Sequence, residues 1–393
     1  MRTLGGPHAP PAPPPSLDWH SLRAVAEAEG VAPALGFAVK TKAPEQIPAT
    51  VWEWLSRTLT DSTAGYLILS HELGRLLEAF DREKVPVIPL KGPALGETLY
   101  AHPALRPCSD LDLLVRRESV RQVDDLLQRL GYRRLADAHT FRFDLTYDRA
   151  TLYEGPTGVH VDLHWGLLSE PRYSWDEREG LAVWGRAVRI RVSGEEAFGL
   201  CPEDLFLYLA AHLAVHHSLA GLLWYYDLYL VLERWGDTLN WEALITRASR
   251  WRVRAALYFA LLELERLFGA RVPAAVMARI RPRSPRAAAM GWLLRHRTFE
   301  QRRQLEHLIT LLLVDRGRDI LGTLRGAFFP PPAWLRVRYE GLASSLPGYY
   351  LAHYRRFGQI VSQATRGLTE RIGKLAKAKP ELVLIGIDIV LGP

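Results

Sequence analysis

Two aspartates one residue apart are the feature of this sequence that most constrains its fold and its chemistry. Asp110 and Asp112 begin the alternating run that ends at Val115, and this alternation predicts a β-strand. Because residues i and i+2 of a strand point to the same face, the two carboxylates lie side by side while the leucines between them face a core. Two adjacent carboxylates repel each other unless a cation lies between them. The pair indicates a metal site; the simpler alternative is a solvated strand end.

The segment before this strand has the composition of an anion-binding turn. The short apolar run over residues 85–90 contains two prolines, which favour an edge strand, and it leads into Lys91 and Gly92. Glycine lets a ligand approach the backbone closely, and a lysine ammonium is a suitable charge for a phosphate. Arg106 and Ser109 follow just before the aspartates. We interpret Lys91, Gly92, Arg106 and Ser109 as nucleotide-binding residues.

A third carboxylate stands on a second alternating segment, residues 158–165. Its apolar residues face one side, and His160, Asp162 and His164 face the other. If this strand pairs near the first, Asp162 completes a carboxylate trio for two metal ions, which in-line nucleotidyl transfer requires. Magnesium, a hard cation that prefers oxygen ligands, suits such a trio. His164 is a further candidate for the same cleft, although the polar face is also consistent with simple solvation.

The segments just described resemble a known family. The runs over residues 90–115 and 161–167, together with Gly131-Tyr132, are similar to uncharacterised bacterial nucleotidyltransferases of the DNA polymerase β-like superfamily. Genes of this family often lie near genes for peptide or polysaccharide biosynthesis. The resemblance extends over most of the chain. It implies that Asp110, Asp112 and Asp162 bind metal and that Lys91 and Gly92 replace the Gly-Ser turn of the superfamily.

The resemblance also implies a reaction. The expected enzyme moves an NMP from an NTP to an acceptor in a biosynthetic pathway, with Mg²⁺ or Mn²⁺ as the cofactor. The acceptor is a hydroxyl or a phosphate of a small molecule, a sugar or a peptide. The alternative is a non-catalytic module that retains the nucleotidyltransferase fold and binds a nucleotide or a partner.

Helical and alternating patterns together predict an α+β fold. A small mixed β-sheet with flanking helices forms the nucleotidyltransferase core, with N-terminal helices before it and a large C-terminal helical domain after it. Within the core, residues 141–147 and 188–192 alternate as strands, and residues 120–130 form an amphipathic helix. The expected boundaries are a disordered Pro-rich tail over residues 1–16, an N-terminal helical region over 17–84, the core over 85–200, the helical domain over 201–365, and a basic and apolar tail over 366–393.

Two histidines in the helical half are further cleft candidates. His212 and His216 are four residues apart, so they share one helix face, as in zinc-binding helices. The glutamate that should follow the first histidine of such a motif is missing. A packed, hydrogen-bonded pair that lines a cleft is therefore the preferred interpretation.

Asp227 is the last candidate. It lies in an otherwise apolar helix, where a charge must be paired or hydrogen-bonded. One hypothesis makes it a general base that activates the acceptor hydroxyl. The other makes it the partner of an arginine such as Arg142, Arg149 or Arg234.

Composition narrows the partners and the compartment. The 393 residues carry a formal net charge of +7, which favours acidic partners such as an NTP. The basic residues are scattered and form no recognition motif, so nucleic acid is not the expected acceptor. Two cysteines do not make a disulfide framework. Without a signal-peptide pattern or an apolar run that could span a membrane, the expected location is cytoplasmic.

Overall fold

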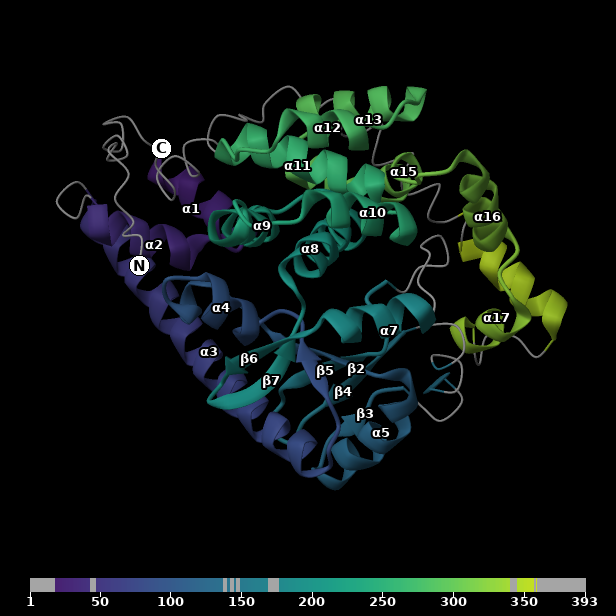
Figure 1. Ribbon diagram of the computed structural model, residues 1–393, viewed down its shortest axis with the longest axis horizontal. Coiled ribbons are helices and arrows are strands. Elements are labelled where there is room, and N and C mark those ends of the chain that lie inside the picture. Colours follow the sequence, from purple (N-terminus) through teal and green to yellow (C-terminus); the bar gives the residue numbers. More distant parts are fainter. Residues whose placement is uncertain are drawn as a thin grey trace.

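A computed structural model describes residues 18–42, 47–136, 140–141, 145, 149–168, 177–339, 345–356 and 358. A small mixed sheet lies in the lower half of the molecule, and a layer of helices lies above it (Figure 1). The two tails expected over residues 1–16 and 366–393 fall outside the described residues. The α+β prediction is confirmed for the part between them.

The central sheet has five strands in the order β1-β2-β5-β4-β3. Its strands are β1 (Val87–Pro89), β2 (Asp110–Val115), β3 (Arg133–Arg134), β4 (Ala150–Glu154) and β5 (His160–His164). Strands β2 and β5 run parallel, and the other neighbours are antiparallel. The two-proline strand β1 lies at an edge, as predicted, because proline cannot donate to a second neighbour.

A separate hairpin joins β6 (Val188–Val192) to β7 (Glu195–Gly199). Its first strand matches the predicted one. The two turn residues, Ser193 and Gly194, have φ angles of 53° and 84°, and positive φ at both centres is typical of a type I′ hairpin turn. By contrast, the strand predicted over residues 141–147 is wrong at Phe141 and Leu145, which are helical; the rest of that segment lies outside the described residues.

One face of the sheet packs on helices α3 (Ala49–Arg82) and α5 (Val120–Arg129). Leu111, Leu113 and Val115 of β2 join the apolar stripes of both helices in one buried cluster. Helix α3 is the long diagonal helix of Figure 1, and its N-terminal part reaches beyond the sheet. There Trp54 and Leu55 belong to the helical core instead. The predicted N-terminal region therefore contributes to two cores.

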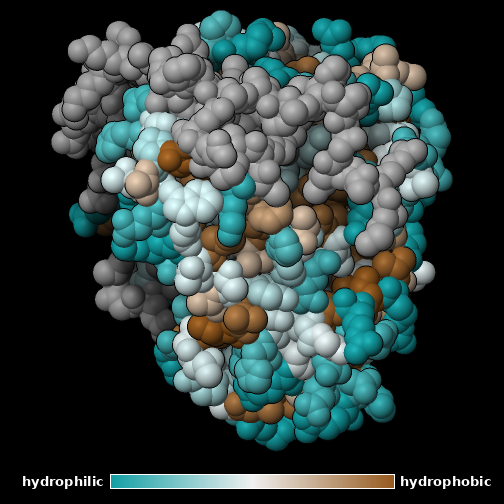
Figure 2. Space-filling model, turned by 90° about the vertical axis from the view of Figure 1, so that its left-hand side faces the viewer, coloured by the Kyte–Doolittle hydropathy of each residue, from teal (hydrophilic) through white to brown (hydrophobic). Residues whose placement is uncertain are grey.

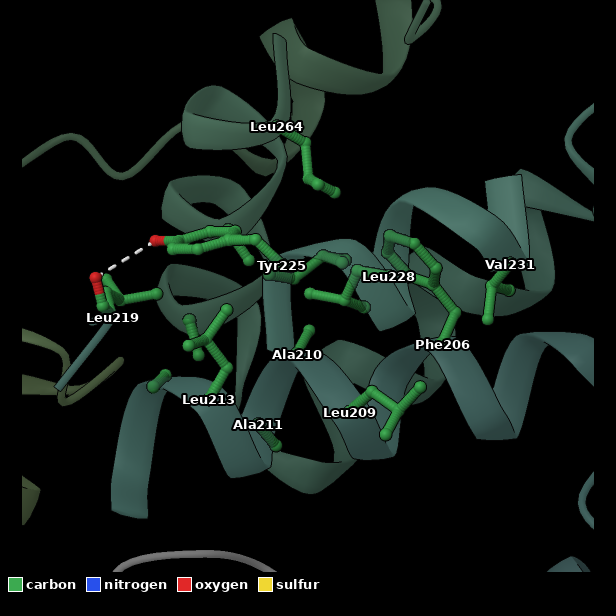
Figure 3. Packing of buried hydrophobic residues seen from close by; sticks show 14 of the residues in the cluster. Phe206, Leu209, Ala210, Ala211, Leu213, Leu219, Tyr225, Leu228, Val231 and Leu264 are labelled. Carbon is green, nitrogen blue, oxygen red and sulfur yellow. Dashed lines mark hydrogen bonds between the residues drawn. The ribbon is translucent and has the colours of Figure 1, made fainter. Parts of the chain in front are cut away.

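The helical core is built mainly from α8 to α13, with α1 and α2 packed against it. Figure 3 shows part of its centre, with Phe206 and Leu213 from residues 202–216, Leu228 from residues 222–235 and Leu264 from residues 254–268 in one buried cluster. The Tyr225 hydroxyl there donates a hydrogen bond of 3.2 Å to the Leu219 carbonyl. The remaining described helices are α1 (Trp19–Ala28), α2 (Ala32–Lys42), α4 (Pro93–Leu99), α7 (Glu177–Arg186), α8 (Pro202–His216), α9 (Leu222–Trp235), α10 (Trp241–Trp251), α11 (Arg254–Phe268), α12 (Ala274–Ile280), α13 (Pro285–His296), α14 (Phe299–Gln304), α15 (Glu306–Leu312), α16 (Gly317–Phe328) and α17 (Pro332–Arg338).

The second face of the sheet is turned toward this helical core. Ile88, Leu90 and Leu114 are buried in the helical cluster, whereas their strand neighbours are buried in the sheet cluster. Asp110 and Asp112 alternate with the residues of the first face, so they share the face of Leu114. The aspartates therefore lie between the sheet and the helical layer.

The outer side of α3 is open to solvent. Leu67 and Ile68 are more than half exposed there. The face of the molecule in Figure 2, which includes this side, is largely hydrophilic with small, separate hydrophobic patches. Among the described helices, none is both long enough and apolar enough to cross a membrane.

Candidate active site

The parallel pairing of β2 with β5 brings the predicted carboxylates together. Asp112 lies directly opposite Asp162, and Asp110 lies opposite His160. Side chains opposite each other in neighbouring strands share a face of the sheet, so all of these groups project toward the helical layer. Asp112 is buried, whereas the side chain of Asp162 is 33% exposed.

Two cations hold the buried carboxylate of Asp112. The Lys91 Nζ lies 3.0 Å from Asp112 Oδ1, and the His164 Nε2 lies 3.2 Å from the same oxygen. Burial opposes the ionisation of Asp112, but Lys91 and His164 outweigh it and hold the pKa of this carboxyl well below its usual range. Asp112 is therefore a carboxylate at neutral pH.

His164 bridges the two opposite aspartates. Its Nε2 also lies 3.2 Å from Asp162 Oδ2. Burial alone lowers the pKa of this imidazole, but Asp162 and Asp112 outweigh burial and raise the pKa to about 9. One ligand atom from each of Asp112, Asp162 and His164 lies within 4.8 Å of the others, which is close enough to share a metal ion. In the absence of metal, protonated His164 supplies the positive charge between the strands.

Asp110 is the least compensated carboxylate of the site. Burial raises the pKa of its carboxyl, the neighbouring Asp112 raises it further, and Lys91 only partly opposes this. Two residues along the strand from Asp112, it adds a third acidic group on the same face. This surplus of negative charge is what a divalent cation neutralises.

The backbone at the end of β1 positions Lys91. The Leu90 N–H donates a 2.9 Å hydrogen bond to the Asp112 carbonyl, which extends the pairing of β1 with β2. Gly92 follows with φ 59° and ψ −131°, and a Cβ there would lie 3.3 Å from the Asp110 carbonyl oxygen. Only glycine readily adopts this conformation against a neighbouring backbone. Ser109, the other predicted polar neighbour, is exposed beside the aspartates.

Helix α8 covers Lys91 from the helical side. The Lys91 Nζ lies 3.4 Å from His212 Nε2, which in turn lies 3.1 Å from His217 Nε2. Burial and the adjacent Lys91 charge lower the pKa of His212 well below its usual value, so it is a neutral ring. The His216 ring centroid lies 4.9 Å from that of His212. Neither histidine joins the group of metal-ligand candidates among the described residues, which favours the packed-pair interpretation.

Arg106 and Asp227 pair with each other. The Arg106 guanidinium donates two 2.9 Å hydrogen bonds to the two oxygens of Asp227, and the Tyr100 hydroxyl donates a third of 2.7 Å. Asp227 is fully buried, and Arg106 is 5% exposed. Asp227 thus has the arginine partner of the second hypothesis, but the arginine is Arg106 rather than Arg142, Arg149 or Arg234. The pair ties the loop before β2 to helix α9.

Sequence reasoning missed the other residues around Lys91. Burial raises the pKa of the Tyr208 phenol, and Lys91 opposes this, because the Tyr208 hydroxyl lies against the ammonium. Tyr208 precedes His212 by four residues, so their i, i+4 spacing carried a signal for a shared helix face. His217 and Tyr100 had no such signal, because the chain reversal after α8 and the contact between α4 and α9 determine their positions.

The two central strands of the sheet thus present acidic and histidine side chains that are close enough to share a metal ion. A family model described as an uncharacterised nucleotidyltransferase matches residues 15–269. The chain belongs to this family of uncharacterised nucleotidyltransferases, as its sequence predicted. The matched range includes all five strands of the sheet and helix α8. The comparison with curated proteins gives no match.

Replacement of Asp227 tests the core ion pair. Asp227→Asn should lower the free energy of unfolding by roughly 3–5 kcal/mol, because it leaves the buried Arg106 charge without a counter-ion. Urea denaturation measures the change, with Asp237→Asn, at an exposed position, as the matched control. A variant of normal stability would contradict a structural role and return Asp227 to the general-base hypothesis.

The charge on His164 gives a pH dependence. In metal-free protein, the His164 ring should titrate near pH 9 in an NMR experiment, with the resonance assigned by its loss in His164→Asn. Because the folded pKa lies above the ordinary value of 6.5, the stabilisation from this ring is complete below about pH 6.5 and is lost as the pH rises through about 9. A titration midpoint at or below 6.5 would show that the ring does not bridge the aspartates.

Proposed function

We propose that this protein is a metal-dependent nucleotidyltransferase that moves an NMP from an NTP to a hydroxyl or phosphate of a small molecule, sugar or peptide. The observation that carries the proposal is the register of the parallel strands, which sets Asp112 against Asp162 with Asp110 on the same face. The family match supports the general kind of activity. The nature of the acceptor, the use of an NTP and the dependence on a metal go beyond the family match and are our proposals.

The donor set fits a divalent cation. Asp112 and Asp162 offer the oxygen ligands that Mg²⁺ and Mn²⁺ prefer, and His164 offers one nitrogen. Asp110 lies on the same face of β2 but is outside this group of ligand atoms. Because imidazole is a softer ligand than carboxylate, its presence favours Mn²⁺ over Mg²⁺. A bound metal would neutralise the triphosphate and lower the pKa of an acceptor hydroxyl. His164 must release its proton before it can become a ligand.

Lys91 has the position expected of a phosphate-binding residue. Its ammonium lies against Asp112, and two neutral groups of α8, His212 and the Tyr208 phenol, lie next to it. A metal bound at Asp112 would neutralise this carboxylate and so weaken its attraction for the Lys91 ammonium. Its charge is then available to the triphosphate, which the glycine at position 92 allows to approach the backbone.

The two opposite aspartates differ in burial, and we propose different roles for them on this basis. Asp112 is 6% exposed and fully engaged, so it serves to hold charge at the floor of the site. Asp162 is 33% exposed and is the group that an acceptor can reach. We therefore assign Asp162 to the acceptor side of the reaction and Asp112 to the triphosphate side.

The direct test is transfer of label. The protein is incubated with α-³²P-labelled NTPs and Mn²⁺ or Mg²⁺, in the presence of small-molecule extracts, and the products are separated and counted. Transfer of the label to an acceptor supports the proposal. Saturable NTP binding without any transfer over a broad acceptor set would favour the non-catalytic nucleotide-binding module.

Removal of either facing carboxylate should abolish transfer. Asp112→Asn and Asp162→Asn should each slow it by about 100-fold or more, comparable to the loss of one major electrostatic element. Asp162→Asn should leave NTP binding largely intact, because it acts on the acceptor side. The matched control is Asp125→Asn on the exposed side of α5. Transfer that persists in both site variants would contradict the proposal.

Lys91→Ala should change two affinities in opposite directions. The binding free energy of a metal–NTP complex should become less favourable by roughly 1–3 kcal/mol, the range for a lost hydrogen bond to a charged group. The affinity for Mn²⁺ alone should rise, because the ammonium no longer competes for Asp112. Calorimetry measures both, with Lys84→Ala at an exposed turn as the control. Unchanged NTP affinity would assign Lys91 a purely structural role.

A further inference from the structure

A cavity lies beyond the carboxylates, at the C-terminal ends of β2 and β5. Its volume is about 520 Å³, within the range of small-molecule sites. Leu114 and Trp165 at the strand ends, the start of α5, and Val183 of α7 contribute to its lining. Leu114 is two residues past Asp112 on the same face, which is roughly 7 Å along the strand. The cavity therefore begins next to the candidate active site.

The lining of this cavity is strongly basic. The described residues of the lining include four arginines, Arg116, Arg117, Arg121 and Arg149, and one carboxylate, Glu118. Arginine presents a planar fork of donors that matches phosphate oxygens, and four arginines against one acid exceed what a single carboxylate ligand requires. The excess of charge points to a phosphate group.

Two of the arginines have contacts that hold their side chains in place. The Arg117 Nη2 donates a 2.6 Å hydrogen bond to the Leu145 carbonyl. The Arg116 guanidinium carbon lies 5.3 Å from the centre of the Trp184 ring. A cavity whose charged groups are already positioned binds a ligand at a lower entropic cost.

Trp165 adds an independent observation. This side chain lines the cavity and is 5% exposed, and in the described part of the chain its indole Nε1 is a buried donor without a hydrogen-bond partner. A buried donor of this kind calls for an explanation. Because this nitrogen has almost no exposed surface, a ligand oxygen in the cavity would pair with it after a small shift of the surrounding wall.

We propose that this cavity binds the phosphate group of the acceptor, so that the acceptor is a phosphorylated small molecule. As a statement about the acceptor, this rests on the proposed function. A ligand anchored by its phosphate among the four arginines extends along β2 and β5 toward Asp162, the carboxylate on the acceptor side. A hydroxyl at the end of the molecule opposite to the anchored phosphate would attack the α-phosphorus of the NTP. The new P–O bond attaches the NMP, the bond to the α–β bridging oxygen breaks and pyrophosphate leaves, and the hydroxyl proton passes to solvent.

The test uses inorganic phosphate and metal-free protein, with no NTP present. The indole N–H resonance of Trp165, assigned by its loss in Trp165→Phe, should shift saturably as phosphate is added. In the double variant Arg116→Gln/Arg121→Gln, the midpoint should rise by about 10-fold or more, because two charged donors are removed. The control is Arg57→Gln/Arg250→Gln, which removes the same charge from exposed positions.

Each other outcome has a definite meaning. Absence of a saturable shift in the wild type, or an equal loss in the control, would overturn the phosphate site. Loss of the shift in Lys91→Ala, with the arginine variant unaffected, would place the anion in the nucleotide site and also overturn it. If the double variant unfolds, Arg121→Gln alone, at the exposed start of α5, tests the same point. Because no NTP is used, failure of label transfer would overturn the proposed function and leave phosphate binding standing.

Discussion

The pairing of β2 with β5 is the constraint on which the rest of the site depends. Their parallel register places Asp112 opposite Asp162 on the face of the sheet that the helical layer covers. Buried carboxylates this close are stable only with compensating positive charge. Lys91 and His164 supply that charge without metal. The site is thus held together by Lys91 and His164, which a metal bound at these aspartates would have to displace or deprotonate.

The candidate site lies at the boundary between the sheet core and the helical core. Leu113 of β2 belongs to the sheet core, and Leu114, the next residue, belongs to the helical core. Strand β2 therefore packs against a hydrophobic core on each face. The Arg106–Asp227 ion pair connects the loop before β2 to α9. A boundary between two packed cores is a common place for ligand sites, because both cores contribute side chains to it. Here the sheet contributes the carboxylates, and α8 contributes neutral groups that cover Lys91.

Features that depend on local residue spacing could be predicted from the sequence. Features that depend on contacts between residues far apart in the chain could not. The i, i+2 spacing of Asp110 and Asp112 fixes their common face, and the alternation around Asp162 predicts its strand. Alternation was misleading at Phe141 and Leu145, which are helical, because β-propensity is a weak local preference that depends on context. The partner of Asp227 lies 121 residues away, and no spacing rule selects Arg106 over another arginine. The raised pKa of His164 likewise depends on strand register, which the sequence alone does not define.

The most direct measurement of the central claim is the position of a metal in crystals soaked with Mn²⁺ and a non-hydrolysable NTP analogue, located by anomalous scattering. The account predicts a peak within bonding distance of Asp112 and Asp162, with the Lys91 ammonium turned from Asp112 toward the phosphates. A peak elsewhere, with the Lys91–Asp112 contact of 3.0 Å intact, would contradict it.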